Sequence, residues 1–283
     1  MAQGHTVRAL VRQAAQRRSL QPSPEWVVGD VADESALSAL LDGVQGVVHC
    51  AFSHVPGRYR GGEGGDLRGF WRSNFGASVR ILRLARGAGV NRVVLMSSRA
   101  VFAGRDPGED PTLPVADDYP PRPDTQYGLL KLAEEQLAAA SADMEVCALR
   151  PTGVYGLSRP AARSKWFDLI GEVLAGTPVT TGRTATEVHG ADVARAVEIL
   201  LSAPAARIRG LAFNCSDITL STRELVQRVA ELAQVSAELP PVSAPVLNPM
   251  SCDRLRALGW RPGGEERLHA ALLELIAAVR AGG

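Results

Sequence analysis

Short runs of apolar and β-branched residues alternate with longer helical patterns through the first two thirds of the chain. This alternation is typical of βαβ units, in which helices cover a parallel sheet. We expect strands at His5–Val11, Val27–Gly29, Gly46–Cys50, Arg92–Met96 and Glu145–Leu149. The last two are nearly continuous apolar runs, as strands buried on both faces are. The sequence therefore predicts an α/β fold with a doubly wound parallel sheet.

Two long helices are predicted between these strands, over Asp66–Gly89 and Asp124–Ala140, because apolar side chains recur there at mostly helical spacings. They could pack on the sheet or against a second copy of the chain in a homodimer. Beyond Arg150 the pattern is less regular and indicates a smaller, mostly helical cap. Its helices are expected at Ser164–Ala175, Asp192–Ser202, Thr222–Gln234 and Glu266–Arg280, the third opening with a capping box at Ser221 and Glu224.

The composition argues against several classes of partner. The 31 Lys and Arg residues nearly balance the 30 Asp and Glu residues, so there is no strong field to attract nucleic acid or an anionic membrane. No run approaches the ~20 apolar residues of a membrane span. The four cysteines form no CxxC pair, and we expect neither a metal site nor a disulfide framework. Reduced thiols and the absence of a targeting segment favour the cytoplasm.

Tyr127 and Lys131 are four residues apart on a predicted helix, which places them on one face. A nearby cation favours a phenolate, so Tyr127 is a candidate acid or base toward a hydroxyl or carbonyl group. The alternative is a solvated helix face on which the pair occurs by chance.

Ser97 and Ser98 end the predicted strand Arg92–Met96. Ligands of doubly wound sheets bind at the carboxyl ends of strands, where a serine can donate a hydrogen bond to a substrate oxygen. Alternatively, the two hydroxyls only cap the following turn.

Taken together, these segments and six others resemble the extended short-chain dehydrogenase/reductase family, of the NAD-dependent epimerase and dehydratase type. The resemblance spans nearly the whole chain, in the family's order. The matching pieces are Gly29–Asp30 (GD), Val47–Phe52 (VIHLAA), Ser73–Ala77 (NVxGT), Ser98–Ala103 (SSxxVYG), Tyr127–Lys131 (YxxxK), Leu149–Gly156 (LRPxNVYG), Val188–Ala194 (HVxDVA) and Leu258–Pro262 (LGWxP).

The resemblance implies a dinucleotide-binding domain at residues 1–155 and a substrate cap at residues 156–283, with some cap segments returning to the sheet. It assigns Tyr127 as the acid/base, Lys131 as the residue that holds the ribose and lowers the pKa of Tyr127, and Ser98 as the residue that binds the reacting oxygen. It implies cofactor contacts from Asp30, Val31, Cys50, Ala51, Phe52, Asn74, Lys131, Pro151 and Val154.

The sequence departs from the family at its start. The family begins with a strand and a glycine-rich turn that meets the pyrophosphate. Met1–Gly4 instead reads as the last turn of a helix, and the run Gly57–Gly65 does not have the GxGxxG spacing. We therefore expect a sheet without its first strand, and an upstream extension of roughly 20–25 residues in the functional polypeptide.

Other departures concern specificity. Arg12 stands after the first predicted strand where an acidic residue would suit NAD, and an arginine there suits the 2′-phosphate of NADP(H); the alternative is an exposed arginine at a strand end. Ala185 replaces the diphosphate arginine of sugar-nucleotide members, which argues against a UDP-sugar, although Arg183 could compensate. His189 is expected to pack or to form hydrogen bonds rather than to catalyse.

We thus expect an NAD(P)-dependent oxidoreductase or epimerase that acts by hydride transfer on a small hydroxyl or carbonyl substrate, with NADP(H) favoured over NAD(H). The alternative is a non-catalytic dinucleotide-sensing or partner-binding protein that has kept the fold. The missing glycine-rich turn favours the alternative, and the Ser98, Tyr127 and Lys131 set favours the enzyme.

Overall fold

The computed structural model describes residues 4–17, 23–55, 58, 61–105 and 108–282. The chain forms two compact units. The first unit comprises Met1–Gly104, Pro121–Leu149 and Leu200–Ala212, and the second comprises Arg105–Pro120, Arg150–Ile199 and Phe213–Gly283. The expected helical turn before Gly4 and part of the run Gly57–Gly65 lie outside the described residues.

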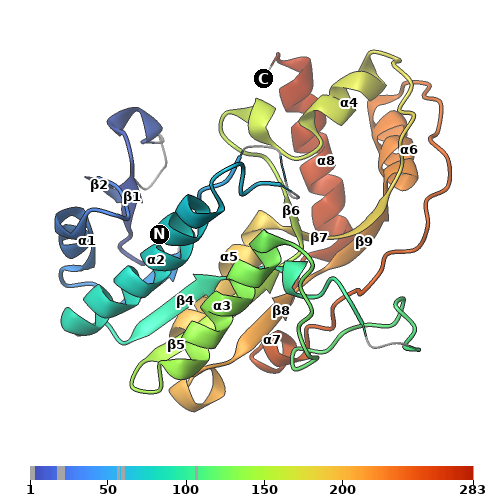
Figure 1. The fold of residues 1–283 in the computed structure, drawn as a ribbon. Coiled ribbons are helices and arrows are strands. Elements are labelled where there is room, and N and C mark those ends of the chain that lie inside the picture. The colour runs from blue at the N-terminus through green and yellow to red at the C-terminus, as the bar shows by residue number, and fades with distance from the viewer. Residues whose placement is uncertain (1–3, 18–22, 56–57, 59–60, 106–107, 283) are drawn as a thin grey trace. The chain divides into compact units, whose positions relative to one another are not determined.

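Parallel strands form the framework of the first unit (Figure 1). They are β1 (Arg8–Val11), β2 (Glu25–Val28), β3 (Gly46–His49), β4 (Arg92–Met96) and β5 (Glu145–Pro151). β1 and β2 form a two-stranded sheet, and β3, β4 and β5 continue into β8 (Ala212–Cys215) in a separate sheet of order β3-β4-β5-β8. Among the described residues, no strand pairs with the second edge of β1 or of β3. The expected doubly wound α/β fold with a parallel sheet is confirmed.

Three α-helices cover one face of this framework, where their apolar side chains meet those of β3, β4 and β5 in a common core. They are α1 (Glu34–Leu41), α2 (Leu67–Gly87) and α3 (Gln126–Ala140), accompanied by the short 3-10 turns η1 (Ala14–Gln16), η2 (Arg99–Val101) and η4 (Ala205–Arg207). Each α-helix begins at a polar cap whose side chain accepts from free backbone amides: Asp33, Asp66 and Thr125. These caps fix where each helix starts, and so where its first residues point.

The second unit combines helices with a three-stranded sheet. The sheet has the order β6-β7-β9, with β6 (Gly153–Tyr155) parallel to β7 (Thr184–His189) and β7 antiparallel to β9 (Ile218–Ser221). The helices are α4 (Phe167–Leu174), α5 (Gly190–Ser202), α6 (Thr222–Ala233), α7 (Asp253–Ala257) and α8 (Gly264–Arg280), with the 3-10 turn η3 (Ala161–Arg163). The sequence pattern predicted four of these helices and missed the sheet, because its strands are short and carry polar residues without clear alternation.

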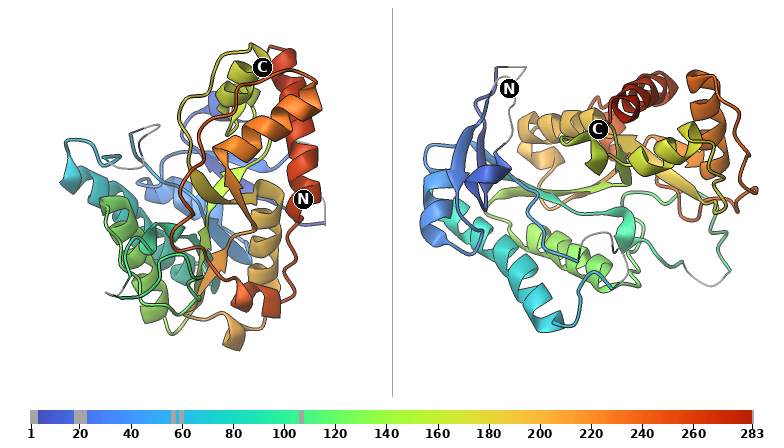
Figure 2. Two further views of the ribbon diagram at one scale, coloured as in Figure 1. Left: turned by 90° about the vertical axis from the view of Figure 1, so that its right-hand side faces the viewer. Right: turned by 90° about the horizontal axis from the view of Figure 1, so that it is seen from above.

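Helices α4, α6 and α8 are grouped together within the second unit and share one apolar core with β6 and β9 (Figure 2). The predicted capping box is present: the Ser221 side chain accepts from the Glu224 amide while the Glu224 carboxylate accepts from the Ser221 amide. Within the described part of the chain, none of the helices combines the length and the apolar character needed to cross a membrane.

Candidate functional site

The first turn of α3 places Tyr127 beside Ser98. Thr125 caps this helix by accepting from the Gly128 amide at 3.0 Å. A Cβ on Gly128 would lie 2.5 Å from the Ala100 carbonyl oxygen, so the close approach of α3 to η2 requires a glycine here. The Ser98 side chain forms a hydrogen bond with Tyr127 and also accepts from the Ala100 amide at 3.2 Å. Two of the three predicted catalytic residues are therefore in direct contact.

Lys131 lies one turn further along α3 and completes the predicted set. Its Nζ is 5.9 Å from the centroid of the Tyr127 ring and 4.6 Å from the centroid of the Phe52 ring. The Phe52 and Tyr127 rings meet edge to face, with centroids 5.1 Å apart. The structure thus brings Ser98, Tyr127, Lys131 and the predicted cofactor residue Phe52 into one cluster at the carboxyl end of β4.

The pKa of Tyr127 differs from the sequence expectation. Burial raises this pKa above the ordinary value for tyrosine, the hydrogen bond with Ser98 lowers it in part, and the charge of Glu134 raises it again. We expected Lys131 to lower the pKa of Tyr127, whereas this pKa is raised and Lys131 is not among the causes of the shift. The main physical reason is that burial disfavours the phenolate, and a carboxylate that pairs with the Lys131 ammonium adds to this effect.

That carboxylate belongs to Glu134, a residue that the sequence analysis missed. Lys131 Nζ donates to Glu134 Oε2 at 2.9 Å, and Ser78 Oγ donates to Glu134 Oε1 at 2.6 Å. His49 Nε2 is in turn 3.1 Å from Ser78 Oγ. Burial, followed by the field of Lys131, lowers the pKa of His49 to about 4, so the imidazole is neutral at pH 7. The spacing of three residues between Lys131 and Glu134 was the available signal, but acidic residues on helices usually face solvent.

Asn74 lies buried on α2 and holds the loop that follows β3. Its Oδ1 accepts from the Ser53 amide at 2.7 Å, and its Nδ2 donates to the Ser53 and Phe70 carbonyl oxygens at 2.8 and 3.0 Å. These bonds fix the loop beside Phe52, so Asn74 contributes to the cluster by positioning.

The remaining predicted cofactor residues lie in several places. Arg12 and Asp30 are exposed and follow the carboxyl ends of the neighbouring parallel strands β1 and β2. The Asp30 carboxylate accepts from the Ala32 amide at 2.8 Å, and the Val31 carbonyl accepts from Arg80. Four others complete the set: Cys50 and Ala51 follow β3 in the first unit, whereas Pro151 and Val154 belong to the second.

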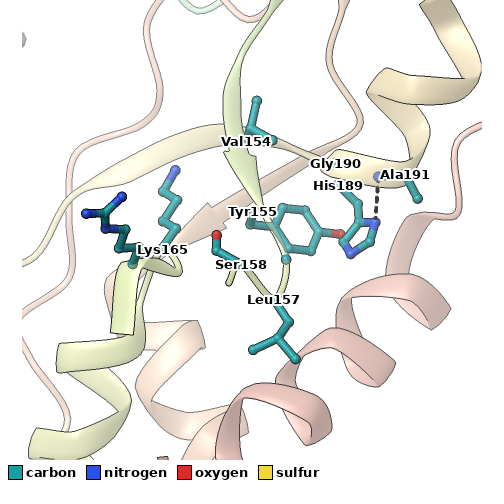
Figure 3. A pocket seen from close by; sticks show the side chains of 10 residues that line it. Val154, Tyr155, Leu157, Ser158, Lys165, His189, Gly190 and Ala191 are labelled. Carbon is teal, nitrogen blue, oxygen red and sulfur yellow. Dashed lines mark hydrogen bonds between the residues drawn. The ribbon is translucent and has the colours of Figure 1, made fainter. Parts of the chain in front are cut away.

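The second unit has a pocket of its own, of about 550 Å³ (Figure 3). Ten residues from β6, the loop after it, and the junction of β7 with α5 line it: Val154, Tyr155, Gly156, Leu157, Ser158, Arg163, Lys165, His189, Gly190 and Ala191. His189 Nδ1 accepts from the Ala191 amide at 3.1 Å, the hydrogen-bonding role expected for this histidine.

Comparison with known proteins identifies the family of this fold. Over 302 residues the chain is 27% identical to 3 beta-hydroxysteroid dehydrogenase/Delta 5-->4-isomerase of Mycobacterium tuberculosis (strain CDC 1551 / Oshkosh), covering 98% of this chain and 75% of the relative. Among solved structures, MoeE5 in complex with UDP-glucuronic acid and NAD has 27% identity and a TM-score of 0.76, covering 100% of this chain and 93% of MoeE5. RMD from Pseudomonas aeruginosa, complexed with NADPH, has 20% identity and a TM-score of 0.75, covering 98% and 99% of the two chains, and shows the fold alone.

The model of the NAD dependent epimerase/dehydratase family matches residues 1–216, which is most of the chain. This protein therefore belongs to that family, with the extended short-chain dehydrogenase fold, and is an NAD(P)-dependent oxidoreductase or epimerase.

Proposed function

We propose that the protein transfers hydride between NADP(H) and a hydroxyl or carbonyl group of a small substrate, with Tyr127 as the acid/base. The observation that carries this proposal is the meeting of Ser98, which follows β4, with Tyr127 and Lys131 of α3 at the carboxyl end of β4. That end of a parallel strand is where doubly wound proteins bind their ligands.

The side chains of the first unit fit a nicotinamide dinucleotide. Lys131 has three N–H donors, of which the described residues use one, so two can bind ribose hydroxyls. The exposed carboxylate of Asp30 suits the adenine end, and the exposed guanidinium of Arg12 suits a 2′-phosphate. When bound, the cofactor supplies or accepts the hydride.

The residues of this chain then carry out the proton chemistry. Ser98 Oγ donates a hydrogen bond to the reacting oxygen, and Tyr127 Oη gives that oxygen a proton or takes one from it. Lys131 holds the ribose, and Glu134 fixes the ammonium of Lys131 through the hydrogen bond at 2.9 Å. Because the Tyr127 phenol is buried and its pKa is raised, we expect oxidation, which needs the phenolate, to speed up as the pH rises.

Three further assignments belong to this proposal. Arg12 favours NADP(H) over NAD(H). The exposed apolar side chains of Val79 on α2 and Leu129 on α3 suit a homodimer contact. The four cysteines are free, which suits the reducing cytoplasm.

A titration of NADPH fluorescence tests the first step. A saturable change is expected with the enzyme. The alternative, a non-catalytic dinucleotide-sensing or partner-binding remnant, rests on the absence of a GxGxxG turn from the sequence. An inert remnant gives no saturable change, and a sensor binds NADPH without transferring hydride to any of a panel of alcohols, ketones and sugars.

Tyr127→Phe tests the chemical step. This variant should lose about 100-fold or more in turnover while its NADPH affinity changes less than about twofold, because only the proton-transferring oxygen is removed. The measurement is the rate of NADPH oxidation with the best substrate of the panel. Unchanged turnover would show that Tyr127 is not the acid/base.

A further inference from the structure

Lys131 and Lys165 are the two lysines of a chain whose other 29 basic residues are arginines. The proposed function uses Lys131 and leaves Lys165 without a role. Lysine differs from arginine in carrying a compact, strongly hydrated point charge with three rotatable donors. Lys165 lines the pocket of the second unit, which places an ammonium where a ligand could contact it.

The charged groups of this pocket are basic. Arg163 and Lys165 line it, and none of the ten lining residues carries a carboxylate. Arg163 is exposed and has no ion-pair partner among the described residues. In Figure 3, Lys165 lies on one side of the pocket and His189 on the other, with Ser158 and Tyr155 between them.

The position of Lys165 is fixed by an ion pair with a buried glutamate. Its Nζ forms an ion pair with Glu187 on β7, whose side chain is only 3% exposed. A Cβ on Gly153 would lie 2.2 Å from Glu187 Oε2 and 2.3 Å from Lys165 Nζ, so a residue without a side chain leaves the room that this pair fills. Gly153 also departs from the family pattern LRPxNVYG, which has asparagine at this position. Both the departure from the family pattern and the packing indicate that position 153 carries glycine because a larger side chain would displace the Lys165–Glu187 pair.

The neighbouring backbone is also set for this arrangement. Trp166 has a φ of +72°, an unusual conformation for a bulky residue, and its ring stacks on Tyr155 with centroids 5.1 Å apart. The Lys165 ammonium lies 5.5 Å from the centroid of the Trp166 ring. A backbone conformation of this kind persists where the surroundings enforce it. Here the stacking on Tyr155 holds the residue that follows Lys165.

Several hydrogen-bond donors remain available in the pocket. Lys165 uses one of its three N–H groups on Glu187 among the described residues. His189 accepts at Nδ1, so the neutral ring carries its proton on Nε2, and no described residue accepts from that nitrogen. The pKa of Lys165 is lowered by burial, opposed by Glu187, and lowered again by Arg183, which indicates that a third cation stands nearby.

We propose that this pocket binds the anionic group, a phosphate ester or a carboxylate, of a small organic molecule, with Lys165 and Arg163 as its charged anchors. That this molecule is the substrate of hydride transfer rests on the proposed function. Arg163 has no ion-pair partner among the described residues, and Lys165 keeps two N–H donors beside its pair with Glu187, so the pocket favours a ligand that carries a negative charge.

Three probes that share one sugar ring test the proposal on the full chain: glucose 1-phosphate, glucuronate and glucose. Calorimetric titration should show saturable binding of at least one anion, and glucose should bind at least tenfold more weakly. The stronger anion identifies the group as phosphate or carboxylate. Equal binding of glucose and both anions, or binding of none, overturns the proposal.

Variants locate the site. Lys165→Met and Arg163→Gln should each weaken the bound anion about tenfold or more, whereas Arg209→Gln, which removes an exposed charge from the first unit, should change nothing. Glu187→Gln should strengthen anion binding, because it removes the competing carboxylate; a purely structural role of the pair predicts weaker binding. Unchanged affinity in Lys165→Met, or weaker binding in a Glu187→Gln variant that still melts cooperatively, overturns the proposal.

These titrations do not involve hydride transfer. Binding of anions by a protein that never oxidises NADPH would leave this inference standing and contradict the proposed function. Turnover by a protein that binds none of the anions would support the proposed function and overturn this inference.

Discussion

Each of the two lysines pairs with a buried glutamate, one in each unit, and the two pairs are built differently. Lys131 and Glu134 lie three residues apart on α3, with side chains 7% and 2% exposed. Lys165 and Glu187 come from a loop and from β7, with side chains 23% and 3% exposed. The Lys131–Glu134 pair is buried beside the Tyr127 ring, whereas the Lys165–Glu187 pair leaves the Lys165 ammonium at the wall of a pocket.

The same ion pair can therefore have two different functions. A fully buried pair neutralises a cation and fixes its position, because the low dielectric makes either charge alone costly. A half-open pair keeps part of its positive field for a ligand. Of the four predictions below, the first two test this distinction, and the other two test the parts of the first unit that surround the Lys131 pair.

The largest effect is expected when Lys131 is removed. Lys131→Ala should lower kcat/KM for hydride transfer about 1,000-fold, or ~4 kcal/mol, and should also weaken NADPH binding, because Lys131 is assigned to the ribose and the phenol. Lys165→Ala should leave NADPH affinity within about twofold. Fluorescence titration and initial rates measure both quantities. Equal losses of NADPH affinity in the two variants would erase the distinction between the lysines.

The two glutamates should differ in their contribution to folding. Glu134→Gln leaves a buried ammonium without its counter-ion and should lower the free energy of unfolding by about 3 kcal/mol. Glu187→Gln should cost only about 1 kcal/mol, because Lys165 can turn toward water. Denaturant unfolding of both variants measures the difference, and an equal loss would contradict the ranking.

A smaller effect concerns the contact that brings Tyr127 to Ser98. Gly128→Ala should destabilise the protein by about 2 kcal/mol and reduce turnover, because the new methyl group meets the Ala100 carbonyl oxygen at 2.5 Å. Gly76→Ala on α2 is the matched control, since nothing lies within 4 Å of the added Cβ and helix propensity alone stabilises it by ~0.5–1 kcal/mol. Thermal melting compares the two, and a stable, fully active Gly128→Ala variant would remove the role given to this glycine.

The smallest effect is expected at Arg12, an exposed residue of the first unit. Arg12→Ala should reduce the preference for NADP(H) over NAD(H) by about 1.5 kcal/mol, roughly tenfold, through loss of one charge-assisted contact. The ratio of the two dissociation constants is the measurement. A ratio that does not move would make Arg12 an ordinary surface residue.

The elements that the sequence predicted best are those whose pattern is local and complete. Strand β4 spans the expected Arg92–Met96, and α2 and α3 begin within two residues of their expected starts, since apolar periodicity and a polar cap mark each one. The capping box at Ser221 was also found from its spacing. Strands β6, β7 and β9 were not found, because three to six residues of mixed polarity carry no periodic signal.

The residues of the candidate site also differ in whether a local sequence signal predicts them. Motifs and short-range spacing were enough to identify the family and the parallel sheet and to predict the set of Ser98, Tyr127 and Lys131. Three features could be seen only in the folded chain: Glu134 pairs with Lys131, the pKa of Tyr127 is raised, and Lys165 pairs with Glu187 in a space that Gly153 leaves open. The physical reason is that the energy of a charge depends on burial and on partners far along the chain, which spacing within one helix does not record.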